Sequence, residues 1–509
     1  MPANTIHPSI ARKPWPMRYS LVAMVWLGLI THVTVSGLAP AFLNADVILN
    51  SVMSLQNVTP FYWGQNRLLN VVPLLAWPIR DPALNLLAIL YLNTGLYYLV
   101  LWIFARGAVA LTAVHAQSRE WLTTAVFVSL SSAALLILTP QATFELSLWH
   151  HEYTLPLVLL GAALLLAHLN PVRASAGKTW LMALCLFVAL GVNPASILVL
   201  GLNVVTYCLV QRKISLGIRQ LVFLGGLFFF FWSAVSIPTG GLTYYTVVPQ
   251  SVLESWKIVW NQLGAILHSA VAGTVLPVLC FASLGMALWQ LFQHRHDTGE
   301  GRVAFNTHLV IAALLSFAAI WTAGFSAHHW VAANAYHWRY FIYAVLAIAA
   351  MFTILFSMAL QRIGKTASVF IAGALGVAAC VQTYLPARHP EQFNVYAQVD
   401  QLSKQSYAFY SGDYWLVWPA VHRDLMRGKE AFGLTLRGNG NATKALAFAR
   451  HQSQSDGTFT VLCLAAPAAK CMQQVSETLG SVEAGQVIPI GNDAAEIRFR
   501  LMASATSPQ

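Results

Sequence analysis

Two short stretches, Asn44-Ala45-Asp46 and Phe61-Tyr62-Trp63-Gly64-Gln65-Asn66-Arg67, lie between the first and second long apolar segments of the chain. Acidic residues are scarce, with 18 among 509 residues. A carboxylate, an arginine, an amide and several aromatic rings can together bind a charged, ring-bearing substrate at a bilayer surface. We therefore predict that this loop holds the active site and that the rest of the chain positions it.

The composition is typical of an integral membrane protein. Hydrophobic residues make up 57% of the chain, charged residues only 9%, and the mean hydropathy is +0.60. Soluble domains carry about 25% charged residues. Apolar runs of about 20 residues recur along the chain, which indicates membrane-spanning helices and not a β-barrel.

We predict about eleven spans within residues 19–385. They cover Tyr19–Ala41, Ala83–Ala105, Trp121–Thr139, Tyr153–Leu169, 179–193, 195–211, Ile218–Ile237, 263–292, 308–326, 340–360 and 367–385. The first could be a cleaved signal peptide, but its length and the segments that follow favour an uncleaved anchor. The fifth and sixth are short and joined at Asn193-Pro194, a turn signal, so this pair could also be a hairpin that does not fully cross.

Charge sets the predicted orientation. If residues 1–18 form a cytoplasmic leader, the inner loops hold 14 Lys and Arg residues, and the outer loops hold only Arg67, Arg80, Lys257 and Arg339. This asymmetry satisfies the positive-inside rule. It also accounts for the net charge of +11 without a nucleic-acid partner. The first outer loop, residues 42–82, and everything after residue 385 are therefore predicted to lie outside the cytoplasm.

Residues 386–509 differ in character, because their basic and acidic residues nearly balance. Thr458–Ala465 and Gln486–Ile490 have the pattern of strands, and Asp400–Tyr410 and Pro419–Met426 that of helices. The predicted fold is therefore an all-α polytopic membrane protein with a small C-terminal α+β extramembrane domain. Cys463 and Cys471 are close enough in sequence to form a disulfide if this domain lies outside the cytoplasm.

Asp46 is the candidate catalytic residue. A carboxylate just past the outer end of a span can deprotonate or orient a hydroxyl group. The alternative is an ordinary aspartate that caps the helix predicted from Val47, a short amphipathic helix lying on the membrane. Arg67 suits a phosphate group, since guanidinium binds two phosphate oxygens at once. It could equally anchor the chain at the interface beside Tyr62 and Trp63.

Further outer loops carry titratable and aromatic residues. Glu145, His150, His151 and Glu152 could bind a metal, but we favour His151 or Glu152 lining a substrate site. Arg339 is the second candidate for phosphate contact, with interfacial anchoring as its alternative. The full set of predicted substrate-binding residues is Arg67, Gln65, Tyr62, Trp63, Glu145, His151, Glu152, Tyr244, Tyr245, Tyr336 and Arg339. No metal ligands are assigned, and dependence on a divalent metal stays open.

Together these features resemble the GT-C superfamily of integral membrane glycosyltransferases. The resemblance rests on Ala45-Asp46, on Phe61–Leu75 (FYWGQNRLLNVVPLL) and on Ser411-Gly412-Asp413-Tyr414-Trp415. The chain is similar to protein O-mannosyltransferases and to the aminoarabinose transferases of lipid A. It differs from many members in having a single acid at this point, because Ala45 and Val47 flank Asp46.

The resemblance implies a transferase that takes a sugar from a polyprenyl-phosphate donor. The acceptor would be a periplasmic glycan, lipid or protein, and the enzyme would lie in the bacterial inner membrane with its C-terminal domain in the periplasm. It implies that Asp46 acts as the base or positions the acceptor, and that Arg67 or Arg339 contacts the donor phosphate. The alternatives are a transporter or flippase, for which mid-membrane charges are typical, and a non-catalytic assembly protein.

Overall fold

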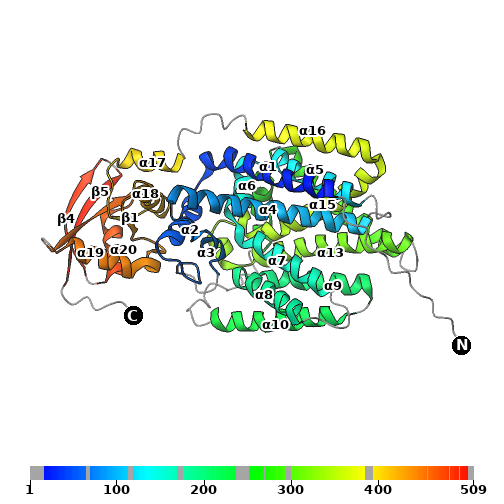
Figure 1. The fold of residues 1–509 in the computed structure, drawn as a ribbon, viewed down its shortest axis with the longest axis horizontal. Helices are drawn as coiled ribbons and strands as arrows, with labels where there is room; N and C mark the ends of the chain where they lie inside the picture. The colour runs from blue at the N-terminus through cyan, green and yellow to red at the C-terminus, as the bar shows by residue number, and fades with distance from the viewer. Residues whose placement is uncertain are drawn as a thin grey trace.

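The computed structural model describes residues 17–64, 69–112, 119–168, 176–212, 214–236, 252–268, 270–293, 300–384, 394–454, 457–480, 482–491 and 493–502. Long helices form one end of an elongated molecule, and a small domain containing a β-sheet forms the other (Figure 1).

The chain is a helical, multi-pass membrane protein. Within the described ranges, nine helices are long and apolar enough to cross a membrane. They are α1 (Met17–Phe42), α4 (Pro82–Thr112), α5 (Arg119–Ile137), α7 (His151–His168), α10 (Leu216–Ser236), α12 (Ala270–Gln293), α13 (Glu300–Ser326), α15 (Ile342–Ile363) and α16 (Lys365–Tyr384). The apolar helices α8 (Ala176–Val192) and α9 (Ser196–Gln211) are shorter. They correspond to the fifth and sixth predicted segments, the pair that could form a hairpin without fully crossing the membrane.

The eighth predicted segment begins too early. The structure divides residues 263–292 between the end of α11 (Val252–Ala265) and α12, with a break before Ala270. Short helical elements connect the long ones. They are α3 (Val71–Ala76), α6 (Pro140–Phe144), the π-helical turn η2 (Glu145–Trp149), α14 (His329–Ala333) and the 3-10 turn η6 (Trp338–Phe341).

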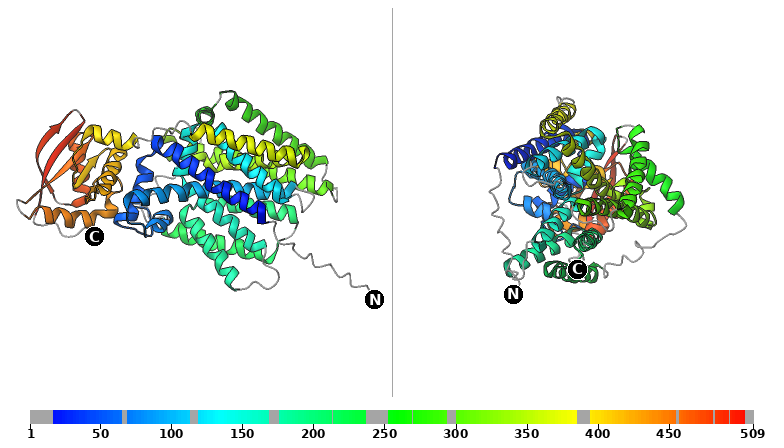
Figure 2. Two further views of the ribbon diagram at one scale, coloured as in Figure 1. Left: turned by 45° about the horizontal axis from the view of Figure 1, so that its top comes forward. Right: turned by 90° about the vertical axis from the view of Figure 1, so that its right-hand side faces the viewer.

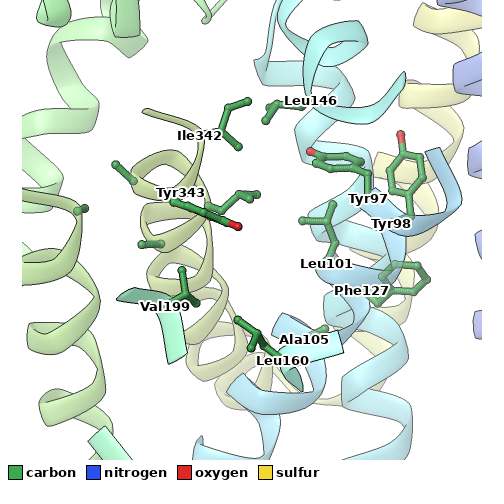
Figure 3. Packing of buried hydrophobic residues seen from close by; sticks show 14 of the residues in the cluster. Tyr97, Tyr98, Leu101, Ala105, Phe127, Leu146, Leu160, Val199, Ile342 and Tyr343 are labelled. Carbon is green, nitrogen blue, oxygen red and sulfur yellow. The ribbon is translucent and has the colours of Figure 1, made fainter. Parts of the chain in front are cut away.

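The helices pack through large apolar side chains inside the bundle and present others outward. Tyr97 and Leu101 of α4 lie across from Tyr343 of α15 in the interior (Figure 3). On the outside, Phe230 of α10, Phe281 of α12 and Phe370 of α16 are each more than 70% exposed. A soluble protein rarely exposes so much apolar surface, whereas lipid chains would cover it in a membrane.

Helix α2 (Ala45–Gln56) joins the two parts of the molecule. It packs against α4 on one side and against α18 (Tyr414–Met426) of the C-terminal domain on the other. Val47, Ile48, Leu49 and Val52 are fully buried. The prediction that this helix lies on the membrane surface is therefore wrong, because its apolar face is covered by protein.

The C-terminal domain is a sheet with helices on both faces. Its remaining elements are α17 (Asn394–Leu402), β1 (Phe409–Gly412), β2 (Phe432–Gly433), η8 (Gly438–Asn441), α19 (Ala442–Gln452), β3 (Thr458–Leu464), α20 (Ala468–Leu479), β4 (Val482–Ile490) and β5 (Ala494–Leu501). The strand order is β2-β1-β3-β5-β4, with β1 parallel to both neighbours and the other pairs antiparallel.

Alternate residues of β1 serve the two faces of the sheet. Tyr410 packs in the same cluster as α17 and α18, which lie between the sheet and the bundle, whereas Phe409 packs with α19 and α20 (Figure 2). The helix predicted over Asp400–Tyr410 is wrong beyond Leu402, where α17 ends, because Phe409 and Tyr410 belong to β1. Cys463 and Cys471 form a disulfide that ties β3 to α20, with 5.9 Å between their Cα atoms.

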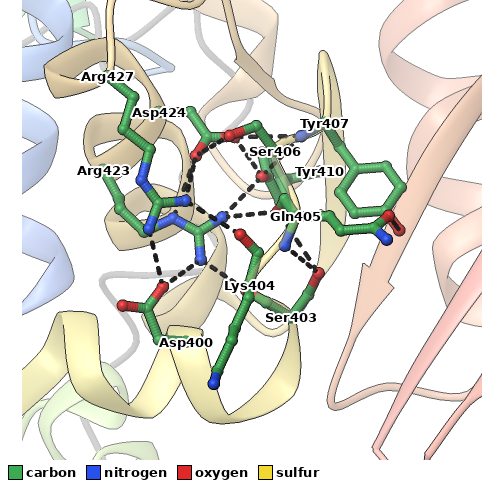
Figure 4. Close-up of polar contacts among 10 residues, drawn as sticks. All are labelled: Asp400, Ser403, Lys404, Gln405, Ser406, Tyr407, Tyr410, Arg423, Asp424 and Arg427. Carbon is green, nitrogen blue, oxygen red and sulfur yellow. Dashed lines mark hydrogen bonds and ion pairs between the residues drawn. The ribbon is translucent and has the colours of Figure 1, made fainter.

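A buried ion-pair network holds α17, α18 and β1 together (Figure 4). Arg423 Nη1 lies 2.8 Å from Asp400 Oδ1, and Arg423 Nε donates to Asp424 Oδ1 at 3.1 Å. The Tyr410 hydroxyl donates to the other oxygen of Asp424 at 2.5 Å. Arg423, Asp400 and Asp424 are thus all paired, as buried charges require.

Candidate active site

The first turn of α2 separates the capping residue from the candidate base. Asn44 is the N-cap, because its side-chain oxygen accepts a hydrogen bond from the Val47 amide at 3.2 Å. Asp46 lies within the first turn of the helix. Its Oδ1 accepts a hydrogen bond from the hydroxyl of Tyr414, which is 368 positions away in sequence. Asn44, and not Asp46, therefore caps α2, so the alternative role considered for Asp46 is filled by another residue.

Charged groups from separate segments surround the Asp46 carboxylate. Burial raises the pKa of Asp46, while the Tyr414 hydrogen bond, Arg339 and His150 lower it and Glu152 raises it further. These partners come from α18, η6, the turn after η2, and the start of α7. Sequence positions that lie far apart thus meet in one half-buried polar cluster, which we call the Asp46 cluster.

Glu145 lies in the π-helical turn η2, a geometry that is rare and is frequent at functional sites. Gln141 donates to its Oε1 at 3.1 Å, and its Oε2 is buried. Burial raises the pKa of Glu145. His337 Nε2 lies 4.0 Å from that Oε2. Because burial lowers the pKa of His337 to about 4, this imidazole is neutral at pH 7.

Glu152 is paired with His150 and lies farther from His151. His150 Nδ1 is 2.7 Å from Glu152 Oε1, whereas His151 Nδ1 is 4.0 Å from Glu152 Oε2. The indole of Trp149 stacks on the His150 ring at 4.5 Å and meets Trp415 of α18 edge-on at 6.3 Å. The loop that carries Glu145, His150, His151 and Glu152 therefore contacts the C-terminal domain next to Tyr414, the hydrogen-bond partner of Asp46.

Arg339 contributes a cationic side chain to the Asp46 cluster. It donates to the Tyr340 hydroxyl at 2.9 Å and to Asn334 Oδ1 at 3.4 Å, and it interacts electrostatically with Asp46. Tyr336 of the same loop accepts a hydrogen bond from Ser255 of α11 at 2.8 Å. That contact ties the loop to α11.

Tyr62 and Trp63 are neighbours in sequence but have different surroundings. Tyr62 interacts electrostatically with Asp46 and Tyr414, and the Arg437 guanidinium lies 5.6 Å from its ring centroid. Trp63 is only 2% exposed, donates to the Asn57 carbonyl at 3.0 Å and packs 6.0 Å from Trp418. We therefore correct the substrate-binding prediction for Trp63: its ring packs between the first loop and the C-terminal domain.

Gln65, Arg67, Tyr244 and Tyr245 lie outside the described residues, so their predicted roles stay predictions. Among the residues that the structure describes, no three His, Cys, Asp or Glu side chains are arranged to hold a metal ion. A groove of about 290 Å³ lies between α1, α4 and α5, with Arg106 and Glu120 among its lining residues. Arg106 lies 24 residues from the start of α4, the end that packs beside α2. At the helical rise this is about 36 Å, so the groove is far from the Asp46 cluster.

The sequence reasoning missed several members of the cluster. Tyr414 lies within the Ser411–Trp415 pattern, which gave a signal for its segment but none for its partner. His150 had been considered only as a possible metal ligand, and His337 belongs to a loop that had been singled out for Tyr336 and Arg339. Arg437 has a left-handed backbone, with φ of 77°, and nothing in its local sequence points to Tyr62.

The chain matches no family model, and no curated protein matches it significantly.

Proposed function

We propose that this protein is a membrane glycosyltransferase of the GT-C type, with Asp46 as its base or acceptor-positioning carboxylate. The observation that carries the proposal is the Asp46 cluster, in which a carboxylate and the cation Arg339 meet although they come from segments far apart in the chain. The donor would be a polyprenyl-phosphate sugar, and the acceptor a hydroxyl of a glycan, lipid or protein.

The reaction needs few protein groups. The acceptor oxygen attacks the anomeric carbon, and the bond from that carbon to the phosphate oxygen breaks. The polyprenyl phosphate leaves with the electron pair of that bond, while Asp46 accepts the hydroxyl proton. One carboxylate suffices for a single displacement with inversion. A fixed cation such as Arg339 would stabilise the charge that develops on the leaving phosphate.

The proposed orientation places the Asp46 cluster and the C-terminal domain outside the cytoplasm of a bacterial inner membrane. The loop charges support this side for both. The Cys463–Cys471 pair also supports it, because structural disulfides persist in oxidising compartments. A donor already flipped to that side would need no nucleotide-binding fold.

The test compares lipid-linked and surface glycans in cells that carry wild type, a deletion, Asp46→Asn or Asp81→Asn at matched membrane levels. Asp81 is a control from the same loop: it is exposed and caps α4 through the Leu84 amide at 2.8 Å, a role that asparagine can keep. We expect the deletion and Asp46→Asn to lose one sugar decoration while its polyprenyl donor accumulates. Asp81→Asn should behave as wild type.

Other outcomes would favour the other functions. If Asp46→Asn behaves as wild type while the deletion has a phenotype, a scaffold role gains and the catalytic role is lost. If the deletion instead leaves the lipid-linked sugar on the inner side of the membrane, a flippase explains the result better. The position of the cluster at the end of the bundle, where α2 meets the C-terminal domain, favours the transferase over a mid-membrane transport site.

A further inference from the structure

The Asp46 carboxylate receives its only hydrogen bond recorded among the described residues from outside the membrane helices. Tyr414 is the first residue of α18, and its hydroxyl donates to Asp46 Oδ1. The other carboxylate oxygen takes no part in this bond. Desolvation raises the pKa of Tyr414 well above its ordinary value, so its hydroxyl keeps the proton that it donates.

The structure holds Tyr414 in place through the C-terminal domain. Gly412 ends β1 with a φ of 114°, and its amide donates to Gln474 Oε1 of α20 at 2.9 Å. Ser411 Oγ donates to the same oxygen at 2.8 Å. Asp413 then caps α18 by accepting from the Trp415 amide at 2.8 Å. The segment that delivers Tyr414 is therefore fixed on both sides of it.

We propose that the C-terminal domain completes the candidate active site, with Tyr414 as the positioning residue for the Asp46 carboxylate. This inference rests on the proposed function, and it assigns the domain a part in catalysis beyond contact with an acceptor. Because Tyr414 occupies one oxygen, the other would be the oxygen that accepts the proton of the acceptor hydroxyl. The hydrogen bond from Tyr414 to the carboxylate also favours the ionised form of Asp46, which is the form that can accept a proton.

Other groups act on the same carboxylate and must stay constant in a test. They are His150 and Glu152 after η2, Arg339 of η6, and Tyr62 of the first loop. His422 of α18 contacts α2 farther along that helix, at Ser51. Asp81, at the start of α4, is occupied with capping that helix. Tyr414→Phe removes one hydroxyl and leaves all of these groups in place.

The experiment measures protonation of Asp46 without any substrate. Dicyclohexylcarbodiimide reacts with protonated, desolvated carboxyl groups, so the labelling of Asp46 can be followed by peptide mass spectrometry against pH in the purified full-length protein. We expect Tyr414→Phe to move the labelling midpoint up by about 1 to 2 pH units, as the loss of a hydrogen bond to a charged carboxylate predicts. Asp46→Asn gives the background signal.

A matched control comes from the same domain. The Tyr407 hydroxyl donates to Glu496 at 2.5 Å, so Tyr407→Phe also removes a tyrosine–carboxylate hydrogen bond. This bond joins the segment before β1 to β5. The substitution should leave the Asp46 midpoint unchanged. Gln474→Leu loosens the segment before Tyr414 without touching Asp46, and we expect a smaller shift in the same direction. This second variant keeps the test sharp if Tyr414→Phe folds poorly.

The cellular glycan comparison separates this inference from the proposed function. We expect Tyr414→Phe to reduce the Asp46-dependent decoration at matched membrane levels. If the decoration depends on Asp46 but neither the labelling midpoint nor the decoration changes in Tyr414→Phe, the positioning role is overturned. If the midpoint shifts but Asp46→Asn leaves all glycans unchanged, the contact stands and the glycosyltransferase function is what fails.

Discussion

At the scale of single residues, the first turn of α2 divides two tasks between Asn44 and Asp46. Asn44 satisfies a free backbone amide of the turn, which an aspartate could also do. Asp46 is thereby left to accept from Tyr414 while it lies at the helix N-terminus, where the backbone dipole favours a negative charge. Burial acts in the opposite direction and raises its pKa. The helix N-terminus and Tyr414 therefore favour the charged form of Asp46, and burial favours the neutral form.

His422 predicts a specific acid sensitivity. It is fully buried on α18, with Nδ1 2.8 Å from the Tyr396 hydroxyl and Nε2 3.2 Å from Ser51 Oγ of α2. Burial lowers its pKa to about 4, whereas an unfolded histidine titrates near 6.5. Between these values the unfolded chain binds more protons, so stability is complete above pH 6.5 and falls as the pH drops toward 4. The loss amounts to about 3 kcal/mol.

The check is the unfolding midpoint of the purified protein in detergent at pH values from 7.5 to 4. His422→Gln keeps polar atoms but cannot titrate, so it should be less stable than wild type at pH 7.5 and show a flatter pH dependence below 6.5. His451→Gln, at an exposed position on α19, should follow the wild-type curve. An equally steep decline in His422→Gln would assign the acid sensitivity to other groups.

At the scale of elements, membrane helices could be predicted from the sequence and the joint between the two parts could not. A spanning helix satisfies its own backbone hydrogen bonds and shows its apolar surface in one continuous run, so α1 and α16 lie within a few residues of their predicted bounds. Helix α2 was expected at the right place but in the wrong surroundings, because α18, which covers it, is more than 350 residues away in sequence.

The joint also predicts the effect of a small substitution at Gly440. A methyl group there would lie 2.0 Å from Cγ of Trp63, and that indole is held by Asn57 and Trp418. A rigid, buried ring cannot move aside at low cost, so Gly440→Ala should destabilise the protein by about 1–3 kcal/mol. Thermal unfolding of the detergent-purified variant measures this change. Gly485→Ala is the control, since the nearest atom to its new methyl is 3.4 Å away. Equal midpoints for both variants would contradict the tight fit at Trp63.

At the scale of the whole molecule, the candidate site lies where two kinds of structure meet. Lys and Arg gather in the loops predicted to be inner, and Arg339 belongs to the small outer set. The sequence could predict Asp46 and Arg339 separately, because scarce charges at span ends stand out in so apolar a chain. Their meeting with Tyr414 depends on how the C-terminal domain docks on α2, and local sequence carries no signal for that contact.

This arrangement makes a prediction about membrane sidedness. In a variant whose four free cysteines, Cys185, Cys208, Cys280 and Cys380, are replaced by alanine, one new cysteine is added at an exposed position. Gln452→Cys on α19 should react with a membrane-impermeant maleimide in intact spheroplasts, while Thr366→Cys at the start of α16 should react only after lysis. The reason is the excess of Lys and Arg in the loops on the side of Thr366. The reverse pattern would place Asp46 on the cytoplasmic side, where a flipped polyprenyl-phosphate donor is out of reach and the transferase mechanism cannot operate.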